Sequence, residues 1–164
     1  TISLVVKFVT QRRRLMTDLL WQRIEQSLAA QTMMRTLGVR LHQVAAGEVW
    51  LAAPILATSR QQQGAGAGAL TFALGDTAAG YAALSQLPED KEVLTAELKI
   101  NFLAPAVGDS LLAVGKVIKG GRRLIVVTAE VFAVTGEERA LIAVLQGTMA
   151  STAADRAYQG AARP

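Results

Sequence analysis

The chain has 164 residues, of which 51% are hydrophobic, and this length suits one domain with a substantial core. It contains no cysteine, which excludes disulfides and thiolate metal sites. Its single histidine, His42, is too few for a zinc site of the usual His or Cys type, and a serine hydrolase triad would require His42 as its base. The net charge of +4 suggests an acidic partner, either nucleic acid or a phosphorylated small molecule. The absence of cysteine is compatible with a reducing cytosol, so we expect a cytoplasmic protein without a metal.

The N-terminal part of the sequence is expected to contain one helix. Residues 1–14 place an apolar run before a basic one, the reverse of a secretory signal, and their structural role is left open, with an additional edge element as one possibility. From Leu15 to Leu28, hydrophobic side chains recur at helical spacing, which predicts an amphipathic helix. No apolar run reaches the roughly 20 residues that cross a bilayer, so we expect no membrane span.

The middle of the sequence predicts two strands followed by a helix. Residues 37–56 are interpreted as two paired strands on either side of a turn at residues 46–47. A loop rich in serine, glutamine and glycine covers residues 57–68. The central helix is expected from about Ala69 to Leu84, and it is composed mainly of small and apolar residues.

The remainder is predicted to be strands joined by short turns. Apolar and polar residues alternate with a period of two in the first of these strands, which gives it one apolar face. The predicted strands cover residues 94–102, 111–118, 123–134 and 140–148. Residues 150–164 are small and polar, and we expect them to form a flexible tail after a single domain of residues 15–149.

This order of elements predicts an α+β domain in which a curved antiparallel sheet wraps around one long central helix. The glycines of the helix, Gly75 and Gly80, support this arrangement, because local propensity alone disfavours glycine in a helix. A helix wrapped by a sheet needs small residues where the two backbones approach each other closely.

Asp76 is the only charged residue between Gln61 and Pro88. A carboxylate in a small and apolar helix is costly to desolvate, so it is retained either by a hydrogen-bonded structural role or by chemistry. We interpret Asp76 as a catalytic candidate.

The segment of residues 61–106, followed by residues 115–133, resembles the PaaI-like acyl-CoA thioesterases of the hotdog fold, within the 4HBT-type thioesterase superfamily. The family motif is Asn or Gln, two residues, Gly, two residues, His-Gly-Gly, and a catalytic Asp nine residues after the His. Gln61, Gly64, Gly68 and Asp76 occupy the matching places without a gap. The resemblance extends from about residue 37 to residue 149.

The resemblance implies a hotdog fold and hydrolysis of an acyl-CoA thioester with an aromatic or medium-chain acyl group. It implies no cofactor, since coenzyme A is part of the substrate. It also implies a homo-oligomer, a dimer with shared active sites that assembles further into a dimer of dimers, although the residues themselves do not distinguish dimer from tetramer. The departures are Ala67 in place of the motif His, Ala69 in place of the second Gly, and Gly66 at a commonly bulky position.

Thioester hydrolysis needs an activated water or a carboxylate nucleophile, together with donors for the oxygen that becomes negative. Asp76 would act as general base or nucleophile, and the backbone N–H of Gly68 would be the donor at the positive end of the central helix. The two residues are eight positions apart, roughly 12 Å along one helix, so one helix cannot bring both to one carbonyl. An antiparallel second copy solves this, which predicts a site at a dimer interface.

The other site residues are assigned by the same resemblance and by chemical type. Gln61 is expected to hydrogen-bond Asp76 or the attacking water, and Thr95 to lie near the carboxylate. Gly64 and Ala67 would contribute to the substrate-binding loop. Two further sets are the phosphate-binding candidates Arg122 and Arg123, with Lys119 as a weaker third, and the acyl-contact candidates Leu70, Tyr81 and Phe72.

Two other functions are compatible with the sequence. Ala67 favours a hotdog protein that has lost catalysis and serves as an acyl-CoA-binding or assembly module, whereas Asp76, Gly68 and Gln61 favour the enzyme. A basic dimer associated with nucleic acid is the weaker possibility, because aromatic residues are scarce and are not interleaved with the basic clusters.

Overall fold

The elements follow one another in the order that the sequence predicts, with two short helical additions. The computed structural model describes the backbone of residues 2–154 and the side chains of residues 14–154. The helices are α1 (Ile2–Ala30), α2 (Thr32–Thr36), the 3-10 turn η1 (Ala57–Ser59) and α3 (Gly68–Leu84). The strands are β1 (Arg40–Ala45), β2 (Glu48–Pro54), β3 (Lys91–Phe102), β4 (Ser110–Lys119), β5 (Leu124–Thr135) and β6 (Glu138–Ala153).

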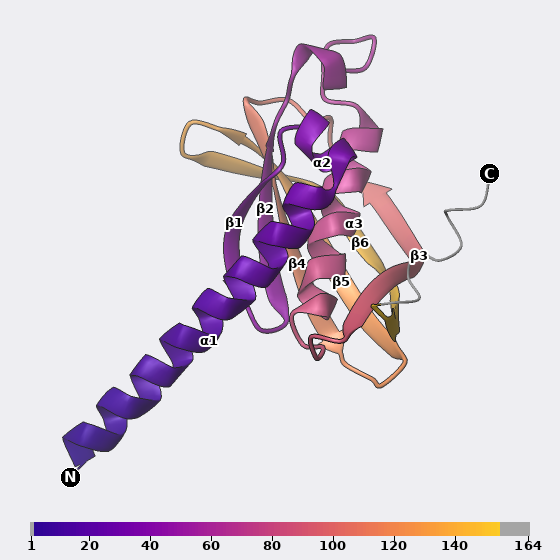
Figure 1. Ribbon diagram of the computed structural model, residues 1–164. Helices are drawn as coiled ribbons and strands as arrows, with labels where there is room; N and C mark the ends of the chain where they lie inside the picture. Colours follow the sequence, from indigo (N-terminus) through magenta and orange to yellow (C-terminus); the bar gives the residue numbers. More distant parts are fainter. Residues whose placement is uncertain (1, 155–164) are drawn as a thin grey trace.

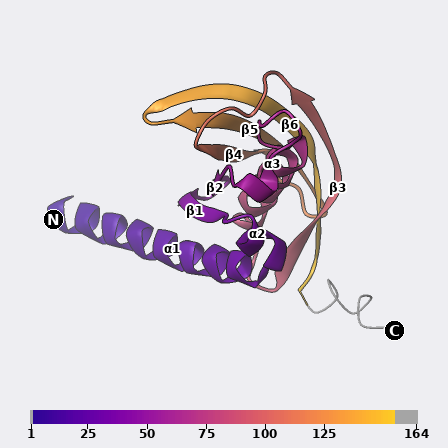
Figure 2. The same cartoon turned by 90° about the horizontal axis from the view of Figure 1, so that it is seen from above.

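The six strands form one antiparallel sheet in the order β1-β2-β4-β5-β6-β3. Strand β3 follows α3 in the sequence but lies at the far edge of the sheet, where β6 is its only neighbour among the described strands. The sheet curves around α3, while α1 and α2 lie on the other side of that helix (Figures 1 and 2). The predicted α+β architecture, with a curved antiparallel sheet around one central helix, is therefore confirmed.

Small residues let α3 lie very close to the sheet. A Cβ atom added to Gly75 would lie 2.9 Å from both methyl groups of Leu145 on β6. On the opposite side of the contact, a Cβ atom added to Gly115 on β4 would overlap the carbonyl oxygen of Ala78. The expectation that the backbones of helix and sheet approach closely is correct. This approach also depends on Gly115 in strand β4, a glycine that the sequence pattern does not single out.

The first helix is much longer than the predicted span of residues 15–28. It begins at Ile2, so residues 2–14 belong to a helix and do not form an edge element of the sheet. Only its C-terminal part enters the core, where Ile24 and Leu28 are buried, and its N-terminal part projects from the domain in Figure 1. None of the described helices is apolar over a length sufficient to cross a membrane.

Arg23 fastens α1 to the turn that joins α3 to β3. Its guanidinium donates hydrogen bonds to the carbonyl oxygens of Leu87 at 2.8 Å, Pro88 at 3.0 Å and Lys91 at 2.8 Å. These three carbonyls follow the end of α3 and begin β3, so α1 holds both elements in place.

The last strand is also longer than predicted. Residues 150–153, which the sequence assigns to a flexible tail, continue β6 and pair with the start of β3, with Ala153 opposite Lys91. The rest of the predicted tail, residues 155–164, lies outside the described residues.

The packing of α3 predicts opposite effects for two added methyl groups. Gly115→Ala is expected to destabilise the protein by at least about 3 kcal/mol, because the new Cβ overlaps backbone that cannot move independently. Gly80→Ala is the matched control, since its Cβ would meet only Val93 at 4.0 Å, and it is expected to stabilise α3 by about 1 kcal/mol. Urea unfolding of both variants measures the difference, and a Gly115→Ala variant as stable as Gly80→Ala would contradict the close approach.

Candidate active site

Asp76 lies in the middle of α3, partly exposed, and accepts a hydrogen bond from Thr95 on β3. The distance from Thr95 Oγ1 to Asp76 Oδ1 is 2.7 Å. A β-bulge interrupts the pairing of β3 with β6 at this point, since Thr95 is opposite Met149 and Glu97 is opposite Thr148. Bulges change the direction in which side chains point and are frequent beside active sites. The structure thus brings together two of the predicted catalytic residues.

The carboxyl group of Asp76 has a perturbed acidity. Burial raises its pKa above the ordinary value for aspartate, because desolvation disfavours the charged form, and the hydrogen bond from Thr95 partly opposes this. A raised pKa makes the carboxylate a better proton acceptor near neutral pH than an exposed aspartate.

The N-terminus of α3 presents an unused backbone donor. Gly68 is the first helical residue after Ala67, and its N–H has no acceptor within the described part of the chain. The turn that leads to it is closed by backbone hydrogen bonds, from Ala67 N to Ser59 O at 2.9 Å and from Gly66 N to Ala106 O at 2.8 Å. The turn therefore forms without the histidine side chain that Ala67 replaces.

Gln61 begins the tight loop before α3. Its N–H donates to Ala65 O at 2.8 Å, and its side-chain oxygen accepts a hydrogen bond from the N–H of Gln63. Gly64 has a φ of +91°, a backbone conformation that favours glycine, and it is exposed. Within one chain Gln61 makes no hydrogen bond to Asp76, so that expected contact is absent from the single chain.

A cavity of about 370 Å³ opens beside the N-terminus of α3. Gln61, Gly68 and Thr71 line it on one side, and the segment from Phe102 to Ala106 lines it on the other. Asp76 does not line it. In one chain, the carboxyl of Asp76 with Thr95 and the unused N–H of Gly68 with its loop are therefore separate, roughly 12 Å apart along α3.

The basic candidates lie toward the other end of α3. Arg122 and Arg123 are exposed in the turn between β4 and β5, and Lys119 is the exposed last residue of β4. Neither arginine forms an ion pair in the described structure. A Cβ atom at Gly120 would lie 3.1 Å from the side-chain oxygen of Gln86, which places this turn just beyond the C-terminus of α3.

None of the three acyl-contact candidates, Leu70, Phe72 and Tyr81, lines this cavity in the single chain. Leu70 is buried in the core and does not line the cavity. Tyr81 faces α1, where its hydroxyl donates to Ser27 at 3.1 Å and accepts from Gln31 at 2.7 Å. Phe72 is partly buried against the core. The apolar wall of the cavity is instead the segment that begins at Phe102, which sequence reasoning missed although an aromatic residue just before a proline-containing turn was visible.

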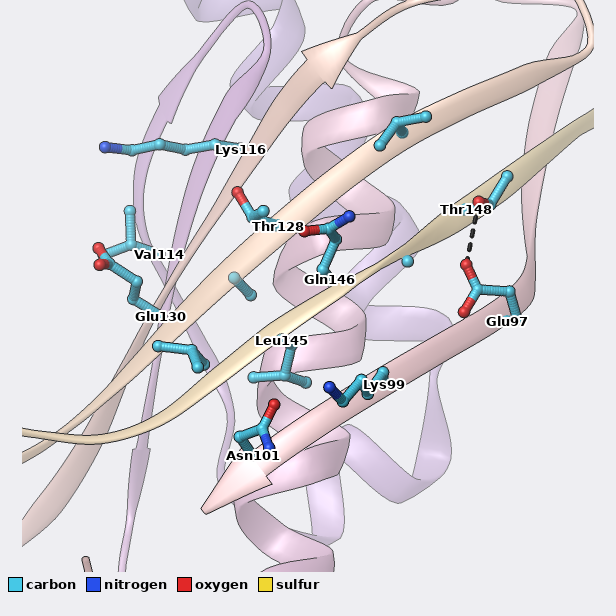
Figure 3. A pocket seen from close by; sticks show the side chains of 14 residues that line it. Glu97, Lys99, Asn101, Val114, Lys116, Thr128, Glu130, Leu145, Gln146 and Thr148 are labelled. Atoms are coloured by element: carbon cyan, nitrogen blue, oxygen red, sulfur yellow. Dashed lines mark hydrogen bonds between the residues drawn. The ribbon is translucent and has the colours of Figure 1, made fainter. Parts of the chain in front are cut away.

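The outer face of the sheet carries a larger hollow of about 800 Å³ (Figure 3). Polar and charged side chains line it, and α3 lies behind the sheet in this view. Glu97 accepts a hydrogen bond from Thr148 at 3.0 Å, and Lys116 lies 3.7 Å from Glu48. The hollow contains none of the predicted site residues, and no group of three potential metal ligands occurs among the described residues.

Comparisons with known proteins identify the family and the fold. The family model of the thioesterase superfamily matches residues 64–140. A thioesterase family protein from Silicibacter pomeroyi is 36% identical, with a TM-score of 0.79 over 82% of this chain and 98% of that chain. The chain belongs to the thioesterase superfamily. The hotdog fold implied by the sequence resemblance is thereby confirmed.

Two further solved structures have a similar fold. A conserved Pseudomonas aeruginosa protein is 30% identical, with a TM-score of 0.67 over 74% of this chain and 94% of that chain. The Escherichia coli PaaI protein from the phenylacetic acid degradation operon is 22% identical, with a TM-score of 0.75 over 84% of this chain and 96% of that chain. Among the curated proteins no sequence matches this chain.

The raised pKa of Asp76 predicts a pH-dependent effect on stability. The folded protein favours the neutral carboxyl, so ionisation of Asp76 weakens the fold as the pH rises through its folded-state pKa. Asp76→Asn is therefore expected to melt at a higher temperature than the wild type at about pH 8, and at the same temperature below about pH 3. Thermal unfolding across this range tests it, with the exposed Asp90→Asn as control. A lower melting temperature for Asp76→Asn at pH 8 would show that the charged form stabilises the fold.

Proposed function

We propose that this superfamily member hydrolyses an acyl-CoA thioester, with an aromatic or medium-chain acyl group, to the free acid and coenzyme A. The observation that carries the proposal is Asp76, a partly buried carboxyl with a raised pKa that Thr95 orients by a 2.7 Å hydrogen bond. An oriented carboxylate with raised basicity is what general-base or nucleophilic catalysis requires.

In the general-base route, Asp76 takes a proton from water, and the resulting hydroxide attacks the thioester carbon. The oxygen that becomes negative accepts a hydrogen bond from the N–H of Gly68 at the positive end of α3. Collapse of this intermediate breaks the C–S bond, and the coenzyme A thiolate takes the proton from Asp76. In the nucleophilic route, Asp76 attacks directly, releases the thiolate and forms an anhydride that water then hydrolyses.

Two chains are needed to complete this site. The free edge of β3 supports a dimer formed along this strand, because an unpaired edge with exposed apolar residues is suited to pairing with a second chain. Leu94 is 47% exposed, and Phe102 and Leu103 are each 55% exposed. A two-fold axis at this edge runs the two α3 helices antiparallel, so Gly68 and Gln61 of one chain face Asp76 and Thr95 of its partner. Two such dimers would form the expected tetramer.

The phosphates of coenzyme A are assigned to Arg122 and Arg123. They lie beyond the C-terminus of α3, roughly 12 Å along the helix axis from Asp76, on the side away from the Gly68 of the same chain. A pantetheine arm that extends from the thioester can cover such a distance. Exposed guanidinium groups without ion-pair partners are available to bind phosphate.

Ala67 is the observation that favours a second function, an acyl-CoA-binding or assembly module without turnover. The closed backbone of the turn argues for the enzyme, because the donor at Gly68 is presented without the histidine. Tight binding of acyl-CoA with no thiol release, and hydrolysis that appears only in Ala67→His, would establish the second function.

The contributions of the Asp76 carboxyl and of the Gly68 N–H to kcat can be measured separately by substitution. Asp76→Asn is expected to lower kcat at least about 100-fold, and Gly68→Pro to lower it about 100-fold, since proline has no N–H to offer the oxyanion. Proline is compatible with the first helical position, and Ala67 already has the φ of −64° and ψ of 144° that a residue before proline prefers. Gly68→Ala keeps the N–H and is the matched control. Thiol release from a panel of acyl-CoA esters measures these effects, and equal rates for Gly68→Pro and Gly68→Ala would remove the donor from the mechanism.

The shared site predicts complementation between two inactive variants. When Asp76→Asn and Gly68→Pro chains are unfolded together and refolded, half of the dimers are mixed, and each mixed dimer has one intact site. Activity is expected to recover to about a quarter of the wild-type value. Mixtures of either variant with itself are the controls. If the mixture stays as inactive as its components, each site is built from one chain.

The phosphate assignment predicts a selective effect on KM. Arg122→Ala and Arg123→Ala are expected to raise KM for coenzyme A esters about 10-fold and to leave hydrolysis of short thioesters without coenzyme A unchanged. Arg35→Ala, another exposed arginine on α2, is the control. Parallel increases of KM for both kinds of thioester would contradict the assignment.

A further inference from the structure

Thr71 is a buried polar residue on α3 whose hydroxyl has no use in the fold. It lies one turn after Gly68 and is 1% exposed. Its N–H donates to Ala67 O at 3.3 Å, but its hydroxyl has no hydrogen-bond partner among the described residues. Thr77, on the same helix, shows the usual arrangement for a helical threonine, in which the hydroxyl donates to the carbonyl oxygen four residues earlier, here Ala73 O at 2.7 Å.

The free hydroxyl of Thr71 reaches the cavity beside the N-terminus of α3. Thr71 lines this cavity. No fully enclosed side-chain oxygen or nitrogen of the described residues lacks a hydrogen-bond partner, so the unpaired oxygen of Thr71 retains access to solvent, and this cavity is the space that Thr71 lines. Helical side chains lean toward the N-terminus, which directs this hydroxyl toward the Gly68 end.

The rest of the cavity is suited to an acyl group. Phe102, Leu103, Pro105 and Ala106 supply apolar surface. The Phe102 ring lies over Gly68, since a Cβ atom added there would be 3.2 Å from the Phe102 Cζ atom. An acyl carbon chain that starts at the Gly68 N–H would therefore pass the aromatic ring and meet the Thr71 hydroxyl within about one helical turn.

We propose that Thr71 selects acyl groups that carry a hydrogen-bonding oxygen, a hydroxyl or a ketone, on the carbon two bonds from the thioester carbonyl. This inference rests on the proposed thioesterase function. A buried hydroxyl left unpaired against an apolar substrate is disfavoured, and a site built around such a group discriminates against analogues that lack the matching oxygen. The 370 Å³ cavity also accommodates an aryl group at the Phe102 end.

The test compares pairs of coenzyme A esters that differ by one oxygen. One pair is 3-hydroxybutanoyl and butanoyl, and the other is 3-hydroxy-3-phenylpropanoyl and 3-phenylpropanoyl, so the two arms distinguish aliphatic from aryl substrates. The wild type is expected to favour the oxygenated member of at least one pair about 10-fold in kcat/KM. Thr71→Val is expected to abolish this ratio, and Thr71→Ser to retain it. A ratio near one in the wild type for both pairs, or a ratio that persists in Thr71→Val, overturns the proposal.

Two further measurements keep the inference separate from the proposed function. If no ester is hydrolysed, calorimetry measures the Kd values of the same pairs. Tighter binding of the oxygenated ester to the wild type, but not to Thr71→Val, would support the proposal. Equal Kd values for the two members of each pair would contradict it. Thermal unfolding of Thr71→Val is expected to give an unchanged or higher melting temperature, because valine replaces an unpaired hydroxyl in an apolar surround. A decrease of several degrees would show a structural role for the hydroxyl and overturn the proposal.

Discussion

The position of Asp76 depends on the contact between the backbones of α3 and β4 at Ala78 and Gly115. Because Gly115 has no side chain, the helix lies directly on the strand, and Gly75 allows the same closeness to Leu145 on β6. Asp76 comes immediately after Gly75 in the helix, so its depth is fixed by these contacts. The carboxyl is thereby left partly buried at the border of the core, where desolvation raises its pKa while Thr95 can still reach it.

Two chemical groups lie at different places along α3, the free backbone N–H at its start and the carboxyl of Asp76 in its middle. The positive end of the helix dipole begins at Gly68, next to a loop and a cavity, whereas the acid lies two turns further on beside the edge strand. One chain therefore presents an unused backbone donor at one place and a carboxyl of raised pKa at another. Strand β3, which carries Thr95, is one of the two edges of the described sheet, so its outer side is open to a second chain.

The sequence predicts the fold and the contact between Asp76 and Thr95 better than the apolar contacts. The central helix is placed to within one residue, because a glycine-rich loop precedes it, and Asp76 and Thr95 meet as expected. The face of α3 that each apolar residue occupies could not be predicted, because small and apolar residues occur on all sides of this helix. The contact of the Tyr81 hydroxyl with Ser27 on α1 was therefore not foreseen. The bulge beside Thr95 depends on pairing with β6, which local sequence does not reveal.

The three hydrogen bonds of Arg23 have a mechanical consequence. They hold the turn in which α3 ends and β3 begins, and these are the two elements whose side chains meet at Asp76 and Thr95. The turn that connects the helix of the carboxyl to the strand of the hydroxyl is thus fixed partly from outside the sheet, by a guanidinium on α1. The angle at which α1 docks and the spacing of α3 and β3 are therefore mechanically coupled through one side chain.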